Sequence, residues 1–179
     1  MSIRSVSNSP MANGGRLNVS SGQLPAGSVL QVVSTTKTDR FSASLAGMSS
    51  TDITGLSLTY ETSDAANKIF ISVQVGAIYN TSTVVPTGIA VFDGTNFLSV
   101  GDSGDSWQRV TSGMGGSGLT TASLSLSIDH IPGAGSKTYS VYVWNLRSDT
   151  LTVRVNYGVS GVTGQMNAAS TMQIMEVAV

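Results

Sequence analysis

Cysteine is missing from this sequence of 179 residues, and charged side chains are scarce, at 11% of the chain. Without cysteine there is neither a disulfide framework nor a thiolate metal site, so stability must come from apolar burial and backbone pairing. Globular proteins usually carry about 25% charged residues. Here Ser, Thr, Asn and 20 Gly replace the missing charge. A surface of this kind is typical of β-proteins that pack against other subunits.

The charge that remains excludes two classes of partner. The net charge is −1, and the nine Lys and Arg residues do not cluster, so we expect no basic surface for nucleic acid or anionic lipid. The N-terminal region lacks the apolar run of a secretory signal, and no stretch approaches the roughly 18 apolar residues of a membrane span. We therefore expect a protein made in a cytoplasm that binds neither nucleic acid nor a membrane.

The first 26 residues differ in composition from the rest of the chain. They are rich in Ser, Asn and Gly, contain Pro10 and Pro25, and show no sustained apolar period. We expect residues 1–26 to form an extended arm with little structure of its own. The remaining length suits one domain with a single core, which we assign to residues 27–179.

Alternation of apolar and polar residues predicts strands throughout this domain. It is clearest over residues 56–60, 69–75, 124–128, 139–144 and 151–157, and weaker over 29–36, 40–45, 88–92, 97–101 and 171–179. Turn signals separate these runs at residues 93–94, 113–118, 132–135 and 147–149. No apolar helical period persists for three turns. The pattern predicts an all-β antiparallel sandwich of about 8–10 strands, a number that suits a jelly roll.

The run Gly101-Asp102-Ser103-Gly104 has the letters that surround the nucleophile of chymotrypsin-like serine proteases. A serine nucleophile needs a base, and in those enzymes the histidine precedes the serine in the chain. The one histidine of this sequence, His130, follows Ser103, and Asp105 stands where the motif requires glycine. We interpret the run as a loop between two strands and expect a protein that is not an enzyme.

His130 and the loop carboxylates are the remaining candidates for metal ligands. His130 continues the apolar alternation of residues 124–128, so we expect a hydrogen-bonded structural residue near a strand end. One histidine does not make a zinc site, unless three copies of the chain bring it together on a threefold axis. Asp93, Asp102 and Asp105 lack the spacing of a calcium loop and are interpreted as turn residues. We expect no metal and no cofactor.

Three aromatic residues are candidates for binding. Trp107 follows the polar loop, and Tyr142 and Trp144 lie on the strand face opposite Val141 and Val143. On that face they fill either the core or an exposed patch. Such a patch would mark a subunit interface or a sugar-binding surface.

Four segments together resemble a known family. They are "GSVLQVVSTTKTDRFS" at 27–42, "DITGLSLTYETSDAANKIFISVQV" at 52–75, "SVGDSGDSWQRVTSG" at 99–113 and the terminal "STMQIMEVAV". In this order they resemble the jelly-roll domain of tailed-bacteriophage virion proteins, over roughly residues 27–179. The tract 113–123 departs from the pattern because it is richer in glycine. The resemblance implies a jelly roll in a non-enzymatic, trimeric surface component of a phage particle.

The short arm favours one location on such a particle. A tail fibre needs a long shaft to carry its tip, but the 26 residues before the sandwich show no heptads. An arm of this length reaches on the order of 80 Å when extended, enough to lie between neighbouring capsid subunits. We therefore expect a decoration or cement protein on the capsid exterior that forms homotrimers and clamps the major capsid protein.

Two alternatives remain open at this point. One is the tip of a tail fibre or head fibre that binds a host surface receptor such as a glycan, and the other is a depolymerase that uses Asp102 or Asp105. Contacts with other virion proteins also remain open. The candidate binding residues are Trp107, Arg109, Tyr142 and Trp144 in the sandwich and Arg4 and Arg16 in the arm.

Overall fold

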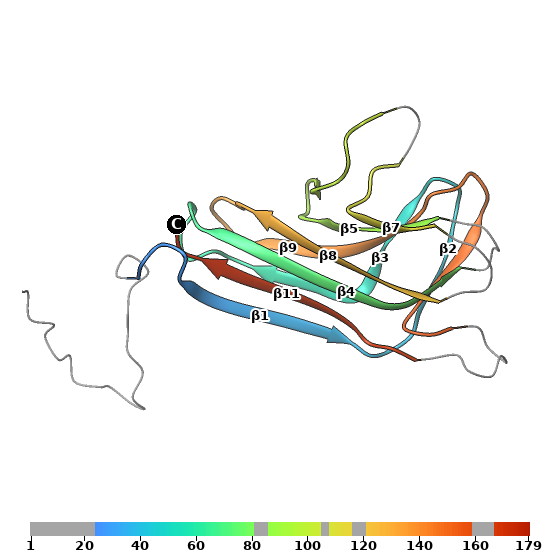
Figure 1. Ribbon diagram of the computed structural model, residues 1–179, viewed down its shortest axis with the longest axis horizontal. Coiled ribbons are helices and arrows are strands. Elements are labelled where there is room, and N and C mark those ends of the chain that lie inside the picture. The colour runs from blue at the N-terminus through green and yellow to red at the C-terminus, as the bar shows by residue number, and fades with distance from the viewer. Residues whose placement is uncertain (1–23, 81–85, 105–107, 116–120, 159–166) are drawn as a thin grey trace, which may run out of the picture.

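The computed structural model describes residues 24–80, 86–104, 108–115, 121–158 and 167–179 (Figure 1). Within these ranges the chain forms strands and no helix, so the all-β prediction is confirmed. The strands in chain order are β1 (Val29–Lys37), β2 (Phe41–Leu45), β3 (Ser50–Tyr60), β4 (Lys68–Asn80), β5 (Thr87–Phe92), β6 (Phe97–Leu98), β7 (Ser112–Met114), β8 (Ala122–His130), β9 (Lys137–Asn145), β10 (Leu151–Val155) and β11 (Ser170–Val177).

These strands form two antiparallel sheets. The first sheet has the order β1-β11-β4-β10-β2, with β8 paired to β4, and the second has the order β3-β9-β5-β6, with β7 paired to β5. Figure 1 shows β1, β11, β4 and β8 running side by side. Four of the pairs are nested along the chain: β1 with β11, β3 with β9, β4 with β8 and β5 with β7. In the sequence, each pair therefore lies between the two strands of the pair before it. In space, successive pairs belong alternately to the first and the second sheet.

The alternation in the sequence explains which residues fill the space between the sheets. On β4 the side chains of Ile69, Ile71 and Val73 are buried, while Phe70 and Ser72 between them are exposed. Because β4 pairs with β11 on one edge and β8 on the other, it is a central strand, as its mostly apolar sequence predicts. The core draws Leu56, Ile89, Leu126, Val141, Val153 and Ile174, among others, from both sheets.

Each predicted strand is found, but several bounds differ; the strand predicted over 151–157, for example, ends at Val155. The predicted strand over 97–101 ends after Leu98, because Ser99 adopts a left-handed conformation with φ of 48°. The predicted loop 113–118 contains part of β7, which pairs with β5. β3 starts earlier than predicted and carries an irregularity where Gly55, at φ of 87°, interrupts its register with β9. Most of the predicted arm, residues 1–23, lies outside the described residues.

A buried carboxylate ties the end of β3 to the last strand. Glu176 on β11 is fully buried and accepts hydrogen bonds from the Tyr60 hydroxyl, from the Ser63 amide at 2.9 Å and hydroxyl at 2.7 Å, and from Asn67 Nδ2 at 2.6 Å. Burial alone would raise the pKa of Glu176, but these donors outweigh it and hold the pKa below its ordinary value. The carboxylate therefore fixes the β3–β4 connection to β11.

We predict that Glu176→Gln lowers the free energy of unfolding by about 2 kcal/mol at pH 7, because the bonds to a charged acceptor are lost. Since folding lowers the pKa, the carboxylate stabilises the protein above its unfolded-state pKa of about 4.5, and this stability is lost as the pH falls through the folded-state pKa. Urea unfolding between pH 7 and pH 3 should therefore show the difference between wild type and variant shrinking with acid. Glu61→Gln, a change at an exposed carboxylate, is the control. A difference that is independent of pH would contradict the prediction.

Candidate binding site on the outer face of the second sheet

Four aromatic side chains gather on the outer face of the second sheet. Phe92 ends β5, Phe97 begins β6, and Tyr142 and Trp144 lie on β9. The ring centroid of Phe97 lies 5.0 Å from that of Phe92, 5.3 Å from that of Tyr142 and 5.3 Å from that of Trp144. The contacts are tilted or edge-to-face, which are favourable arrangements for aromatic pairs. We call these four residues the aromatic cluster.

Small residues on β5 make room beside this cluster. Gly88 and Ala90 lie opposite Trp144 and Tyr142 on β9, and both are buried. A Cβ atom on Gly88 would come within 2.5 Å of the Val110 side chain, so Val110 packs directly on the backbone of β5. Glycine at position 88 therefore allows the segment that precedes β7 to lie over the sheet.

Backbone bonds hold this segment in place. The Thr111 amide donates to the Ile89 carbonyl at 3.0 Å, and the Thr111 hydroxyl donates to the Leu98 carbonyl at 3.0 Å. The Gly101 amide donates to the Val110 carbonyl at 3.4 Å. These bonds bring the residues after β6 and the residues before β7 together at the edge of the aromatic cluster.

A hollow of about 520 Å³ lies between this segment and the aromatic cluster. We call it the aromatic hollow; it is lined by Asn96, Phe97, Val100, Gln108, Arg109 and Trp144. Arg109 is exposed, and its Nε donates to the Gly101 carbonyl, which holds the side chain at the rim. Phe97 and Trp144 are half-buried and present apolar surface to the hollow. The hollow thus combines aromatic rings, planar amides and one cation, and it is large enough for a small ligand.

The structure brings together three of the six predicted binding residues. Arg109 and Trp144 line the hollow, and Tyr142 packs against Phe97 beside it. Tyr142 and Trp144 lie half-buried on the outer face, so of the two expected positions they occupy a surface patch rather than the core. Trp107, Arg4 and Arg16 lie outside the described residues.

Four other residues line the hollow that were not predicted from the sequence: Asn96, Phe97, Val100 and Gln108. Phe92 and Phe97 flank the predicted turn at Asp93-Gly94, which was a signal that two aromatic rings would meet across that turn. That they also meet Tyr142 and Trp144 depends on the pairing of β5 with β9, which no short-range pattern reveals.

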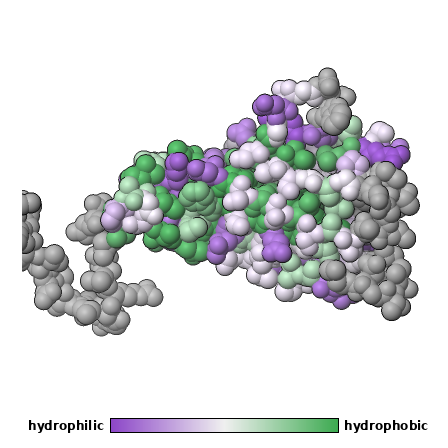
Figure 2. All heavy atoms as spheres, viewed as in Figure 1, coloured by the Kyte–Doolittle hydropathy of each residue, from purple (hydrophilic) through white to green (hydrophobic). Residues whose placement is uncertain are grey.

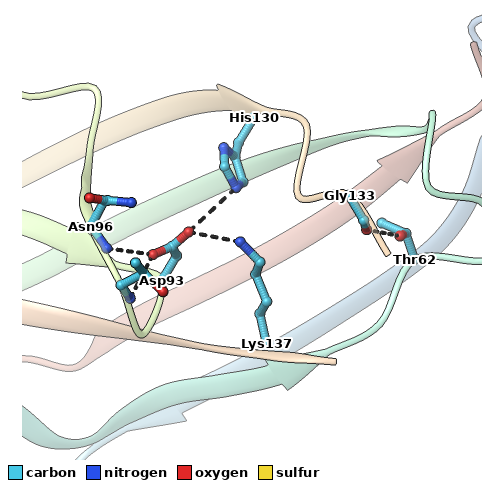
Figure 3. A network of polar contacts seen from close by, with 7 residues as sticks. Thr62, Asp93, Asn96, His130, Gly133 and Lys137 are labelled. Carbon is cyan, nitrogen blue, oxygen red and sulfur yellow. Dashed lines mark hydrogen bonds and ion pairs between the residues drawn. The ribbon is translucent and has the colours of Figure 1, made fainter. Parts of the chain in front are cut away.

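A cluster of polar residues fixes the turn that carries Asn96 and Phe97 (Figure 3). The Asp93 carboxylate accepts hydrogen bonds from the Thr95 amide at 2.9 Å, from the Asn96 amide at 2.7 Å and from Lys137 Nζ at 3.0 Å. Burial raises the pKa of Asp93, but these donors outweigh it and keep the pKa below its usual value. Asp93 is a turn residue, as predicted, and it also joins β9 to the β5–β6 turn.

His130 approaches the same carboxylate from the other sheet. Its Nε2 lies 3.9 Å from Asp93 Oδ2, and its ring meets the Tyr139 ring edge-on with centroids 6.1 Å apart. Its position at the end of β8 agrees with the prediction, but the expected hydrogen bond does not form. Nε2 is buried with no hydrogen-bond partner among the described residues. Burial, together with the nearby charge of Lys137, lowers the pKa of His130 although Asp93 and Asp129 oppose the shift.

The residues considered for catalysis and metal binding lie apart. Ser103 is in the exposed loop after β6, and the contacts of His130 are with Asp93 and Tyr139. Within the described ranges no three histidine or carboxylate side chains lie close enough to hold a metal ion. The same part of the chain contains no helix with the length and hydrophobicity that a membrane span requires. Asp105 lies outside it.

The outer face of the first sheet is a second surface with little charge. Its side chains form three rows of four across β1, β11, β4 and β8: Ser34, Gln173, Ser72 and Ser127; Thr36, Thr171, Gln74 and Ser125; and Val32, Met175, Phe70 and Asp129. Asp129 is the one charged residue among them, and it pairs at 3.3 Å with Lys68, which lies beside the third row on β4; Val32 is 50% exposed. In Figure 2 hydrophobic residues gather toward the end of the molecule near the C-terminus, which Figure 1 marks. We call these three rows the uncharged face.

No protein-family model matches this chain, and no curated protein matches its sequence. The function of the chain is therefore inferred from the geometry of these two outer faces and from the resemblance of its sequence to phage virion proteins.

We predict that His130 titrates below pH 6.5, and that Lys137→Gln raises its pKa because a neighbouring positive charge is removed. Since folding lowers the pKa of this histidine, the protein should lose stability as the pH falls below 6.5. As the chain has one histidine, a single imidazole signal in an NMR pH titration reports the pKa directly. Arg147→Gln, at an exposed arginine remote from the imidazole in sequence, is the control. A pKa of 6.5 or higher in the wild type would contradict this assignment.

Proposed function

We propose that the sandwich is a jelly roll. If β2, β6 and β10, which lie outside the nested pairs, are set aside, eight strands remain, and they pair first with last, second with seventh, third with sixth and fourth with fifth. In the sheets they follow the orders β1-β11-β4-β8 and β3-β9-β5-β7. A jelly roll is a double sheet of eight strands, a fold found in viral capsid and lectin domains. The nested pairing therefore supports the fold that the resemblance implies.

We propose that the protein is a non-enzymatic surface component of a bacteriophage particle that assembles as a homotrimer. The observation that carries this proposal is the uncharged face. This face exposes the apolar side chains of Val32 and Phe70 and carries one charge among its twelve residues, a combination suited to contact with another subunit. The scarcity of charge in the whole sequence has the same explanation, because charged residues are depleted where subunits meet.

Within such a particle, capsid decoration is the function that we favour. The major capsid protein is the proposed partner, contacted by the uncharged face and by the N-terminal residues, including Arg4 and Arg16. Binding of this kind would clamp neighbouring capsid subunits and stabilise the head. The proposed location is the outside of the capsid.

The aromatic hollow favours a second candidate function, recognition of a host surface receptor by a fibre tip. Aromatic rings beside planar polar groups are typical of sites that bind a small ligand or the exposed end of a larger one. The hollow lies on the second sheet, so it remains open when the uncharged face of the first sheet is covered. A fibre tip would assemble through the uncharged face and bind its receptor in the aromatic hollow.

We predict that the double variant Ser34→Lys and Ser127→Lys folds but loses trimer formation and capsid binding. Both positions are exposed, so the fold tolerates lysine, whereas burying two unpaired charges at an interface should weaken binding about tenfold or more. Light scattering gives the oligomeric state, and cosedimentation with particles that lack the protein gives capsid binding. The matched control is Thr54→Lys and Ser57→Lys, at exposed positions of β3. Unchanged binding by the first variant would refute the proposed interface.

For the second candidate, we predict that the labelled protein binds host cells and blocks phage adsorption. The variant Phe97→Leu should reduce this binding, because it removes a ring of the aromatic cluster while keeping an apolar side chain of similar size. Wild-type phage is the positive control for the cells. Absence of binding, together with antibody labelling of the capsid face rather than the tail in electron micrographs, would exclude a fibre tip.

A further inference from the structure

The lining of the aromatic hollow limits the chemistry of what it can bind. Of the six described residues that line it, Phe97, Trp144 and Val100 are apolar, and Asn96, Gln108 and Arg109 are polar. Neither a lipid tail nor an inorganic ion matches this mixture. A lipid tail would leave the amides and the guanidinium unpaired, and an ion would leave the aromatic rings uncovered. The ligand should therefore have one apolar side and several polar groups around it.

The aromatic rings are held in place before any ligand binds. Phe97 contacts Phe92, Tyr142 and Trp144, so its ring is surrounded by three others. Phe97 also follows the β5–β6 turn, which is fixed by the hydrogen bonds from the Thr95 and Asn96 amides to the Asp93 carboxylate. A rigid aromatic surface loses little conformational entropy on binding. The C–H bonds on one side of a pyranose ring form an apolar patch that can cover such a surface.

The polar half of the lining suits a ring that carries hydroxyl groups and an acid. The amides of Asn96 and Gln108 each offer a donor and an acceptor in one plane, which matches neighbouring hydroxyl groups. Among the lining residues that the structure describes, Arg109 is the one charged side chain, and none is a carboxylate. Its Nε is bonded to the Gly101 carbonyl, so a ligand would pair with the two terminal nitrogens of the guanidinium. A guanidinium binds a carboxylate through two parallel, charge-assisted hydrogen bonds.

We propose that the aromatic hollow binds an acidic saccharide. The sugar ring lies against Phe97 and Trp144, its carboxylate pairs with Arg109, and its hydroxyl groups bond to Asn96 and Gln108. This inference deepens the receptor-binding candidate and rests on it for its biological setting. The binding itself is a property of the isolated chain, so it can be measured without phage or host.

The test is an NMR titration of the full-length protein with methyl glucuronide, a methyl sialoside and methyl glucoside. The glucuronide and the glucoside differ only in the carboxylate. We expect an acidic sugar to bind about fivefold more tightly than the glucoside, because one exposed charge-assisted pair contributes about 1 kcal/mol. Resonances of Gln108, Arg109 and the Trp144 indole should shift, and added salt should weaken the preference.

Three variants separate the parts of the site. Arg109→Gln should abolish the preference for the acidic sugar while leaving weak binding of the glucoside. Phe97→Leu should weaken the binding of all three sugars. Arg147→Gln is the matched control, because this exposed arginine pairs with Asp149 outside the hollow and its loss should change nothing. Amide spectra show for each variant that the fold is retained.

Two results would overturn the inference. One is that no acidic sugar shifts the hollow resonances at concentrations of tens of millimolar, a weaker interaction than specific recognition requires. The other is that Arg109→Gln keeps the preference. Failure of the receptor function has a different signature: acidic sugars bind the hollow, but the protein does not bind host cells. If cell binding requires Phe97 while no acidic sugar binds, the receptor candidate stands and the ligand class proposed here is wrong.

Discussion

The burial of the two inner sheet faces against each other is the constraint on which the rest of the structure depends. Nested strand pairs place residues that are more than 100 positions apart side by side, as β1 and β11 are. These pairs are held in register because a slip of one residue would turn every inward apolar side chain to solvent. With the inner faces occupied in this way, the two outer faces, the sheet edges and the loops remain for contacts with other molecules.

Buried polar groups fix the conformation of the turns, because they form directional hydrogen bonds that apolar side chains cannot form. Glu176 anchors the β3–β4 connection, and Asp93 closes the β5–β6 turn. Asn156 donates to the Lys37 and Asp39 carbonyls and accepts from the Ser170 hydroxyl, so it joins three strand ends. Asn145 fixes the β9–β10 turn, because its Nδ2 donates to the carbonyls of Leu45, Ala46 and Asp149. Each group is satisfied by several partners, which is the condition for burying a polar side chain at low cost.

The strands could be predicted from the sequence because alternation is a local property, whereas the site depends on pairing. In the run over 69–75 the buried side chains are those at every second position, as the alternation predicts. β7 was not predicted, because Gly113 has no side chain and so interrupts any alternation. The segment is a strand because it pairs with β5. Glu176 stands at an inward position of its strand, but its donors at 60–67 are remote in sequence. The alternation places Tyr142 and Trp144 on one strand face but leaves open whether that face is core or surface. Asn96 and Phe97 lie beside them because of the order of the strands, which no local pattern shows.

The position of the aromatic hollow on the sheet opposite the uncharged face has a consequence for avidity. If subunits assemble through one face, each adds a hollow to the other side of the assembly, and several copies can bind one polymer at once. Once one site has bound the polymer, the effective concentration of the polymer at the neighbouring sites reaches the millimolar range. A hollow that holds a single sugar weakly would then be sufficient for firm attachment of the whole assembly. The same weakness would let individual contacts break and form again, so that the assembly can move along the polymer.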